Sequence, residues 1–490
     1  MKNKKKNDTP VIEEVRNLPP KSVPWIIACA FFMQMLDGTI LNTALPSIAY
    51  SISESPLHIQ SIIISYFLTV AFLLPLSGWL ADRFGSRKIF GFAIIIFTVG
   101  SILCSMSNTL MQLVLARIFQ AAGGALMVPV GRLIVLKIYP KDQLIRVLSL
   151  IVLPALIGPL LGPVIGGFIV EYYTWHWIFL INVPIGILCL WANFTKMPDT
   201  REEEIYPFDW AGFIPFAIAT LLLCIATNDS KLLETSLLLK FAMIVVAAVF
   251  LSLYWIHARK KIRPLFSPKL LKIPSFTIGA ITGIFSRIGI TGLPYLAPLL
   301  LQVGLGISPS KAGMMILTLS ISALIARYFV ENVLNFFGYR NFLFYNTILQ
   351  GLLFCCFGFI NEQTPYFLTI ILFYVVGTSN SFQFASMATL SLIDLPKRYS
   401  SEGNALTSVM MQIAATVGIG IAAAILNFFS LPGQSGYELL PAFHTTFIIL
   451  GIFTILTSVN FLFTPKNAGK LWKTIEAEIE AATPTQAAAE

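Results

Sequence analysis

The stretch GWLADRFGSRK, residues 78–88, forms a short charged segment between two long apolar runs. These runs cover about residues 60–81 and 89–106, and each is long enough to cross the roughly 30 Å hydrocarbon core of a bilayer as a helix. Gly85 permits a tight turn, and the acidic Asp82 can complement a helix terminus. Because the remaining charges are basic, we expect this stretch to be a cytoplasmic turn between two transmembrane helices.

Similar apolar runs occupy most of the chain. Of its 490 residues, 56% are hydrophobic and only 12% are charged, against about 25% in a typical soluble protein. This composition leaves too little polar surface for a soluble enzyme, a nucleic-acid binder or a disordered scaffold, and the continuous runs do not alternate as β-barrel strands do. We predict an all-α membrane protein with fourteen transmembrane helices, at residues 25–47, 60–81, 89–106, 110–136, 147–170, 177–195, 209–227, 237–256, 275–302, 309–335, 341–360, 366–390, 403–429 and 441–464.

The distribution of basic residues predicts the orientation of these helices. Of the 33 Lys and Arg, 26 fall in one alternate set of loops together with both tails, three fall in the opposite set, and four lie inside predicted spans. This asymmetry is the positive-inside pattern, and it predicts that both termini are cytoplasmic. The net charge of +9 therefore reflects membrane topology and requires no nucleic-acid partner.

Two short sequences hint at an internal repeat. Residues 82–87 read DRFGSR and residues 335–340 read NFFGYR, and each follows the second helix of a six-helix set. Chance similarity is the alternative, but parallel six-helix halves are a known transporter plan with the substrate site between the halves. We expect a cytoplasmic N-terminal tail (1–24), an N-terminal six-helix bundle (25–196), two inserted helices with cytoplasmic connectors (197–274), a C-terminal six-helix bundle (275–464) and a cytoplasmic C-terminal tail (465–490).

Three charged side chains lie near the predicted midplane of the membrane, where charges are costly and usually functional. At 1.5 Å per residue, Asp37 and Arg287 lie about 18 Å from the cytoplasmic boundary and Arg117 about 10 Å from the opposite one. Burial favours a protonated carboxyl group and a nearby guanidinium favours the charged form, so Asp37 could bind and release a proton as its surroundings alternate. The alternative is a fixed Asp37–Arg117 ion pair. Arg117 itself stays charged, and it either sets the protonation of Asp37 or holds an anionic substrate.

Arg287 has no acidic neighbour on its own predicted helix. It is either a substrate-binding residue or a structural arginine capped by backbone carbonyls of the Gly- and Pro-rich segment 289–298. We group it with polar side chains inside other spans as the substrate-binding candidates, which are Gln34, Asn42, Gln120, Arg287 and Gln412.

Two stretches have the composition expected of moving or sealing parts. The charged turn at 78–88 would suit a gate between two helical halves, with Gly78, Asp82, Arg83, Gly85 and Arg87 as the gating candidates. Residues 158–167 read GPLLGPVIGG, in which repeated Gly gives a close helix contact and Pro gives bends. This second stretch is either plain tight packing or a seal or pivot, and its candidates are Gly158, Gly162, Pro163, Gly166 and Gly167.

No pattern indicates a metal, a cofactor or an enzyme. The six Cys all lie in apolar spans, and the four His lie at helix ends or in loops. None of them has the spacing of a disulfide framework, a zinc site or a nucleophile triad. We therefore expect no bound metal, no cofactor and no enzymatic activity.

Several motifs together resemble the major facilitator superfamily, and within it the fourteen-spanning drug/proton antiporters. The likeness covers nearly the whole chain except both tails. Ala121 stands where the fourth-helix motif usually has Gly, and the second half keeps only residues 337–340 of the signature loop. The matching stretches are the signature loop at 78–88, LDGTILNTALP (36–46), RIFQAAGGA (117–125), the antiporter motif at 158–167, WIFLINVP (177–184) and FDWAG (208–212).

The resemblance implies the major facilitator fold, two six-helix bundles plus two extra helices, and a proton-coupled exporter of small molecules, as in multidrug efflux. It implies alternating access in the bacterial inner membrane, proton coupling by Asp37 and Arg117, gating by Asp82 and Arg83, and an antiporter helix at 158–167. The family favours lipophilic, often cationic drugs, whereas two arginines against one aspartate near the midplane favour organic anions or metal chelates as the alternative. A membrane receptor or enzyme is the distant alternative. Expected partners are the substrate, protons and the lipid bilayer, with a monomeric protein.

Overall fold

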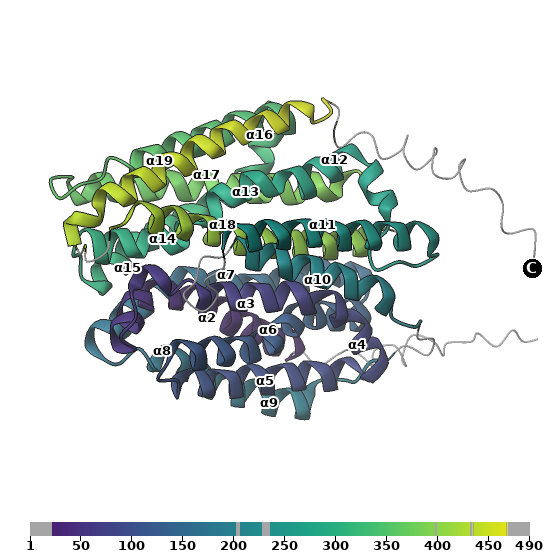
Figure 1. The fold of residues 1–490 in the computed structure, drawn as a ribbon. Coiled ribbons are helices and arrows are strands. Elements are labelled where there is room, and N and C mark those ends of the chain that lie inside the picture. The colour runs from purple at the N-terminus through teal and green to yellow at the C-terminus, as the bar shows by residue number, and fades with distance from the viewer. Residues whose placement is uncertain are drawn as a thin grey trace, which may run out of the picture.

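The computed structural model describes residues 22–201, 206–227, 236–396, 399–431, 434, 436–466 and 468. All regular structure in these residues is helical, and the long helices run side by side (Figure 1). The all-α prediction is therefore confirmed. Most of the two predicted tails, 1–24 and 465–490, lies outside the described residues.

The helices fall into two halves (Figure 1). The N-half comprises α2 (Val23–Ser51), α3 (Ser61–Leu73), α4 (Ser77–Phe84), α5 (Ser86–Ser105), α6 (Leu110–Ile138), α7 (Lys141–Tyr172), α8 (Trp177–Leu180) and α9 (Asn182–Lys196). The C-half comprises α12 (Pro274–Phe276), η5 (Thr277–Thr282), α13 (Gly283–Thr291), α14 (Leu293–Leu299), η6 (Leu300–Gly304), α15 (Pro309–Arg327), α16 (Val330–Phe357), α17 (Tyr366–Ile393), α18 (Ser400–Phe429) and α19 (Leu440–Thr457). Between them in sequence lie α10 (Trp210–Ala226) and α11 (Leu237–Lys260), and α10 contacts both α3 and α18.

Each of the fourteen predicted spans coincides with a helix or a run of helices. Within the described residues, twelve helical stretches are long and apolar enough to cross a membrane. The two predicted spans outside this set correspond to α10, which has 17 residues, and to the part of α16 that follows Gly338.

Two glycines adopt the same unusual backbone conformation. Gly85 follows α4 with φ 95° and ψ 132°, and Gly338 interrupts α16 with φ 72° and ψ 157°. A positive φ with an extended ψ is essentially restricted to glycine. The two Phe-Gly-x-Arg sequences thus form matching turns, which supports the internal repeat. The predicted span 309–335 differs in detail, because α15 ends at Arg327 and helix resumes at Val330.

The helix predicted at 275–302 is broken into short pieces. Wide π-helical turns at η5 and η6 flank the α-helical pieces α13 and α14. Such turns appear often at functional sites, because they displace the side chains that follow them. Arg287 lies in α13, between these two irregular turns.

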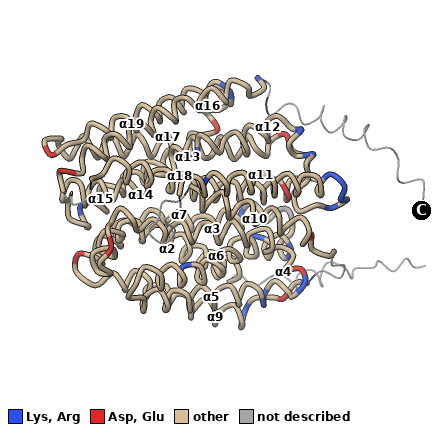
Figure 2. The backbone as a smooth tube through the Cα atoms, in the orientation of Figure 1, with Lys and Arg blue, Asp and Glu red and all other residues tan. Residues whose placement is uncertain are grey.

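The hydrophobic core is shared between the halves at one end of the molecule and divided at the other. One buried cluster takes residues from both halves, among them Leu57, Trp175 and Leu440. Separate clusters lie in the N-half, with Phe97, and in the C-half with the inserted helices, with Phe276. Most Lys and Arg gather at the end where α4 and α12 lie (Figure 2). We call this the basic end, and the opposite end, where the core is shared, the closed end.

Candidate functional site

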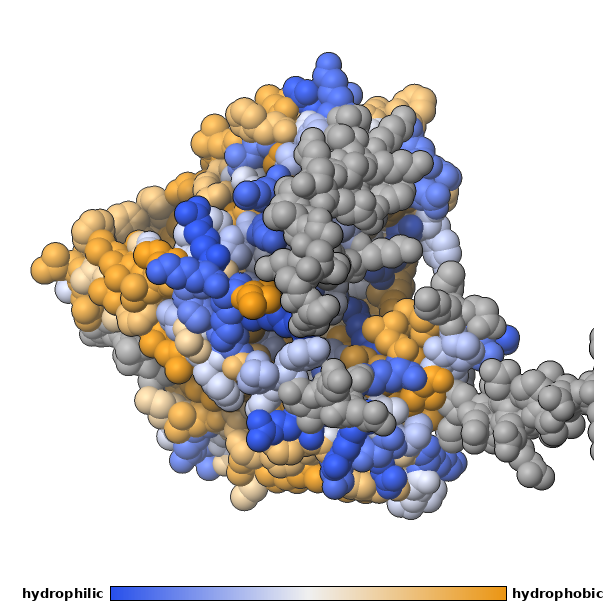
Figure 3. Space-filling model, turned by 90° about the vertical axis from the view of Figure 1, so that its right-hand side faces the viewer, coloured by the Kyte–Doolittle hydropathy of each residue, from blue (hydrophilic) through white to orange (hydrophobic). Residues whose placement is uncertain are grey.

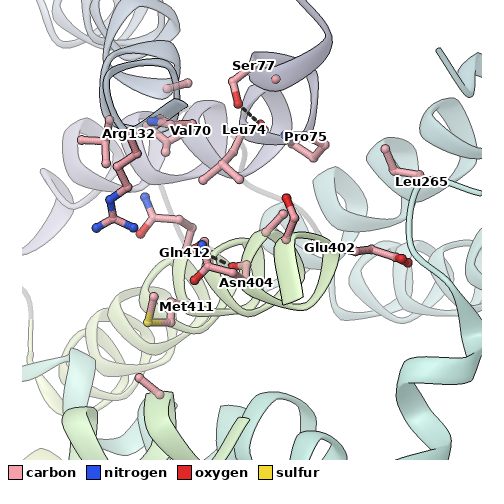
Figure 4. Close-up of a pocket in the computed structure, with 18 of the residues that line it drawn as sticks. Val70, Leu74, Pro75, Ser77, Arg132, Leu265, Glu402, Asn404, Met411 and Gln412 are labelled. Atoms are coloured by element: carbon pink, nitrogen blue, oxygen red, sulfur yellow. Dashed lines mark hydrogen bonds between the residues drawn. The ribbon is translucent and has the colours of Figure 1, made fainter. Parts of the chain in front are cut away.

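A cavity of about 2280 Å³ lies between the two halves. Its wall is built by α2, α3, α4, α6 and α7 of the N-half and by α15, α17 and α18 of the C-half. Residues 258–272, at the basic end, also line it, so the cavity opens toward that end, where hydrophilic side chains gather (Figure 3). Asn404, Met411 and Gln412 of α18 lie across the cavity from Arg132 of α6 (Figure 4).

The described wall of the cavity has a strong excess of positive charge. Eight of its side chains are basic, and one, Glu402, is acidic. A concave surface with this balance attracts anions and repels cations. The basic side chains are Arg132, Arg259, Lys260, Lys261, Arg263, Lys269, Lys272 and Arg327.

The segment 261–272, which we call the basic connector, is held to the inserted helices by Asp209. This carboxylate precedes α10 and accepts hydrogen bonds from Lys261 Nζ at 2.8 Å and from Leu265 N at 3.0 Å. His257 Nε2 lies 2.9 Å from the same carboxylate. Burial raises the pKa of Asp209, but the hydrogen bonds, led by those with Lys261 and His257, outweigh it and hold the pKa below its usual value.

Two further contacts fix the basic connector. The Tyr254 hydroxyl of α11 donates to Phe266 O at 2.7 Å and accepts from Phe266 N at 2.8 Å. Glu402 of α18 accepts a hydrogen bond from Ser267 N. The basic connector therefore ties the inserted helices to the C-half at the mouth of the cavity.

The N-half encloses a buried charged cluster, which we call the N-half cluster. Arg117 Nη1 lies 2.7 Å from Asp37 Oδ2 and 2.7 Å from Gln120 Oε1. Gln120 Nε2 and Asn182 Nδ2 each donate to Asp37 Oδ1 at 2.9 Å, and Gln120 also donates to Ser101 Oγ at 2.8 Å. Asp37 therefore accepts hydrogen bonds from side chains of α6 and α9.

This cluster is separated from the cavity. Asp37 and Arg117 are each 1% exposed, and neither is among the residues that line the cavity. The rings of Tyr66 and Phe179 lie 4.3 and 5.8 Å from the guanidinium of Arg117. Gln34, three residues before Asp37 on α2, does line the cavity. The structure thus joins Asp37 and Arg117 in an ion pair, which was one of the two hypotheses drawn from the sequence. Their role in proton coupling stays a prediction.

The C-half contains a second buried cluster, built from amides and hydroxyls, which we call the C-half cluster. Asn346 Nδ2 donates to Gln383 Oε1 at 2.8 Å, and Ser379 Oγ donates to Asn346 Oδ1 at 2.9 Å. Gln383 Nε2 donates to Thr347 Oγ1 at 2.8 Å and to Ser286 Oγ at 3.3 Å. These bonds join α16 and α17 to α13.

Arg287 lies next to this cluster without a negative partner. It is 2% exposed, and its Nη1 and Nη2 find no hydrogen-bond partner among the described residues. The ring of Phe384, which lines the cavity, lies 5.3 Å from its guanidinium carbon. Within the described residues, these two nitrogens therefore lack the backbone carbonyl partners that the structural alternative predicted for Arg287.

Two of the five substrate-binding candidates line the cavity, and the other three do not. Gln34 and Gln412 line the cavity. Gln120 belongs to the N-half cluster, and Arg287 lies behind Phe384. Asn42 is half-buried and lies outside the cavity wall.

The charged turn at 78–88 is fastened within the N-half. Asp82 accepts a hydrogen bond from Lys137 Nζ at 2.7 Å. The guanidinium of Arg83 lies 5.1 Å from the ring of Trp79. Gly78 faces the cavity, and a Cβ built on it would meet no atom within 4 Å.

The segment after α9 completes this turn, a role that was not predicted from the sequence. Ser86 N donates to Thr200 O at 3.1 Å, and Arg87 N donates to Asp199 Oδ1 at 3.3 Å. A Cβ built on Gly85 would lie 2.6 Å from Asp199 Oδ1. Gly85 is therefore required both by its positive φ and by this close approach.

Helix α7 has two close-packed faces. Gly158, Gly162 and Gly166 recur every four residues and face α2. A Cβ built on Gly158 would lie 2.8 Å from Leu36 N, and one on Gly166 would lie 2.5 Å from Ile40 O. Small residues thus let α7 approach the backbone of α2, as such spacing does between membrane helices.

The second face of α7 meets α15 of the C-half. A Cβ built on Gly167 would lie 2.9 Å from the carbonyl carbon of Pro309, and one on Gly313 would lie 2.9 Å from that of Pro163. The stretch predicted as a packing face or a seal therefore packs in both directions. One face serves the N-half internally, and the other holds the two halves together.

Hydrogen bonds reinforce the contact between the halves at the closed end. Ser310 N, in the first turn of α15, donates to Glu171 Oε2 of α7 at 2.8 Å. Tyr295 Oη of α14 donates to Leu57 O at 3.1 Å. Together with the shared core, these contacts close the cavity away from the basic end.

Most of the polar side chains in the two buried clusters were not predicted from the sequence. Asn182 was inside a quoted motif but received no role, and Ser101 carried no signal. A signal did exist for the C-half cluster, because polar residues recur at 346, 347 and 350 and at 379, 380 and 383, spacings that place them on one helix face. No group of three or more His, Cys, Asp or Glu that could hold a metal occurs among the described residues.

Comparisons with known proteins agree with this architecture. The family model described as Major Facilitator Superfamily matches residues 27–391 and 279–486. A protein of Pectobacterium atrosepticum named "Putative multidrug resistance protein MdtD" is 43% identical over 445 residues, which cover 90% of this chain and 93% of the relative. A protein of the same name from Serratia proteamaculans is 43% identical over 86% of this chain and 88% of its own length.

Solved structures share the fold at low sequence identity. The crystal structure of a D-xylose-proton symporter matches with a TM-score of 0.64 and 17% identity, over 92% of this chain and 99% of that chain. A POT family transporter in complex with a thioalcohol conjugated peptide matches with a TM-score of 0.68 and 16% identity, over 92% of this chain and 100% of that chain. At these identities the likeness concerns the fold alone.

Proposed function

The chain belongs to the Major Facilitator Superfamily, and from this premise we propose that it is a proton-coupled exporter of small molecules that works by alternating access in the bacterial cytoplasmic membrane. As a member of the superfamily it is a multi-pass secondary transporter and not an enzyme. The relatives named for multidrug resistance support export of varied small molecules.

The shape of the molecule supports alternating access. With the basic end in the cytoplasm, as the positive-inside pattern favours, the cavity faces the cytoplasm and the α7–α15 contact closes the outer side. Residues 25–196 and 275–464 then act as the two moving bundles, with 197–274 as the insert. In the outward-facing state the C-half would close on the open surface at Gly78.

One observation carries the proton-coupling part of the proposal, namely a buried carboxylate bonded to two other helices. Protonation of Asp37 would weaken its bonds to Arg117, Gln120 and Asn182 at once. Because these partners lie on α6 and α9, a proton on Asp37 changes how α2 packs in the N-half. Because Asp37 is closed off from the cavity in this state, the proposal requires a rearrangement that opens a path for the proton.

The test is transport by the purified full chain in liposomes with an imposed proton gradient. Ethidium serves as a cationic probe, and its gradient-driven uptake is compared with its exchange in the absence of a gradient. We expect Asp37→Asn to lose gradient-driven ethidium uptake and to keep ethidium exchange. The control Glu331→Gln, which changes an exposed carboxylate of α16, should keep both. Unchanged gradient-driven transport in Asp37→Asn would refute this role of Asp37.

A second candidate function, export of organic anions or metal chelates, is favoured by the charge of the cavity wall. Eight basic side chains against one carboxylate disfavour a cationic substrate in the inward-facing cavity. The same liposomes can be tested with carboxyfluorescein, an anionic dye. Faster transport of carboxyfluorescein than of ethidium would support the anion exporter, and the reverse order would support a cationic drug exporter.

A further inference from the structure

Arg287 is a charged side chain in the membrane interior whose neighbours do not compensate its charge. The guanidinium is 2% exposed, and its two terminal nitrogens have no partner among the described residues. A buried unpaired charge is costly, and the Phe384 ring at 5.3 Å restores only part of the lost hydration. The protein therefore keeps a positive charge at a place where its own side chains do not compensate it.

Carboxylates on the helices around α13 are too far along those helices to reach Arg287. Asp394 follows Phe384 by ten residues at the end of α17, which corresponds to about 15 Å of helical rise. Glu402 lies in the first turn of α18, whereas α13 meets α18 near Gly418. Glu331 lies in the first turn of α16, at the basic end.

The neutral groups beside Arg287 are suited to an anion. Ser286, the preceding residue, belongs to the C-half cluster, where its hydroxyl accepts a hydrogen bond from Gln383 Nε2 at 3.3 Å and can still donate one. The Phe384 ring lies between the guanidinium and the cavity, in a wall whose basic side chains concentrate anions. Phe384 is thus a side chain that both contacts the guanidinium and lines the cavity.

We propose that Arg287, with Ser286 beside it and Phe384 as its cover, forms an anion-binding site in the wall of the cavity. The ligand is a small anion, either a halide ion or the carboxylate of a molecule in the cavity. The halide case is independent of the proposed function, whereas the carboxylate case rests on it, because the anion is then part of a transported molecule. Anion binding supplies the negative charge that the surroundings of Arg287 lack.

The experiment measures thermal unfolding of the purified full-length protein in lipid nanodiscs. Sodium HEPES, whose anion is a bulky sulfonate, is the reference, and chloride or benzoate replaces it at constant ionic strength. We expect a saturable rise in the unfolding temperature of the wild type of roughly 2–5 °C with chloride, benzoate or both. Chloride alone would identify an inorganic ion, and benzoate that competes with chloride would identify a carboxylate subsite.

Arg287→Met provides the sharpest variant, because the sign of its effect depends on the anion. In HEPES it removes an uncompensated buried charge and should unfold at a higher temperature than the wild type. At saturating anion it should unfold at a lower temperature, with no anion response. Arg146→Gln, which changes an exposed arginine of α7 outside the cavity wall, should keep the response of the wild type.

Two results would overturn the proposal. One is a wild type whose unfolding temperature responds to neither chloride nor benzoate. The other is an Arg287→Met protein that responds to these anions as the wild type does. Where Arg287→Met does not fold, Arg287→Lys and Ser286→Ala replace it. An unchanged anion affinity in both of these variants would also overturn the proposal. Loss of ethidium or carboxyfluorescein transport in liposomes would not affect a positive halide result, so failure of the transport proposal remains distinguishable.

Discussion

The two buried arginines, Arg117 in the N-half and Arg287 in the C-half, are almost equally inaccessible but have opposite surroundings. Arg117 is 1% exposed and contacts a carboxylate at 2.7 Å, whereas Arg287 is 2% exposed and has neutral neighbours. The N-half cluster thus pairs its positive charge with a carboxylate, and under the proposed function its net charge changes when Asp37 binds a proton. Arg287, beside the neutral C-half cluster, keeps a positive charge that an external anion would neutralise under the proposal made above. Under the two proposals made above, the N-half responds to protons and the C-half to anions.

The largest expected effect comes from removing the negative charge of the N-half cluster. Asp37→Ala leaves Arg117 buried without a counter-charge, and breaking a buried pair in this way costs about 3–5 kcal/mol. The measurement is the free energy of unfolding of the purified protein in detergent micelles with added denaturant. In this variant Arg117 is placed in the situation of Arg287, so anions should now stabilise the N-half as well.

A double variant separates lost charge compensation from lost packing. Asp37→Ala with Arg117→Met removes both charges, and it should recover most of the stability lost in Asp37→Ala. A double variant as unstable as Asp37→Ala would contradict the view that charge neutralisation distinguishes the two halves.

The next largest effect concerns the close helix contacts, a feature in which the two halves should be alike. A Cβ on Gly162 would lie 3.0 Å from Ile40 N, and one on Gly418 would lie 2.6 Å from Ile288 O. Gly162→Ala and Gly418→Ala should each lower the free energy of unfolding by about 1–3 kcal/mol, because neither backbone can move away freely. Gly38→Ala, which meets no atom within 4 Å, is the control and should be neutral or slightly stabilising. A tolerated alanine at only one of the two contacts would show that the halves also differ in packing.

A smaller effect concerns Asp209, which links the inserted helices to the basic connector. Its folded pKa lies below the usual value, so its carboxylate stabilises the fold above the unfolded pKa of about 3.9. This contribution is lost as the pH falls through the lower folded pKa. Asp209→Asn should therefore lower the free energy of unfolding by about 1–2 kcal/mol near pH 7, and the difference from the wild type should vanish in strong acid. A difference that persists unchanged in strong acid would mean that the charge is not responsible.

The smallest effect is expected at Lys137, which pairs with Asp82 in the gating candidate. The side chains are 16% and 34% exposed, so water screens the pair, and Lys137→Gln should cost less than about 1 kcal/mol. Unfolding of this variant beside Asp37→Ala compares an exposed ion pair with a buried one in the same half. A loss as large as that of Asp37→Ala would contradict the ranking of effects by burial.

The sequence predicted the depth of residues better than the direction in which they point. Helical rise correctly brought Asp37 and Arg117 to one level, because distance along a helix depends only on residue number. It did not reveal that the pair is closed off from the cavity, since α2 is apolar on nearly every side and gives no rotational signal. Arg132 and the basic connector were missed in the cavity wall for a related reason. Their positions depend on how α6 and the inserted helices pack against the rest of the molecule.

The most direct test of the central claim, that a proton on Asp37 drives the movement of the halves, is a distance measurement across the mouth of the cavity. Spin labels at Lys88 and Asn404, which are exposed on the N-half and on α18, report the opening in a cysteine-free protein in nanodiscs. We predict that lowering the pH shifts the wild type from the open mouth toward a closed one, and that Asp37→Asn gives one distance distribution at every pH. A full pH response in Asp37→Asn would contradict the account.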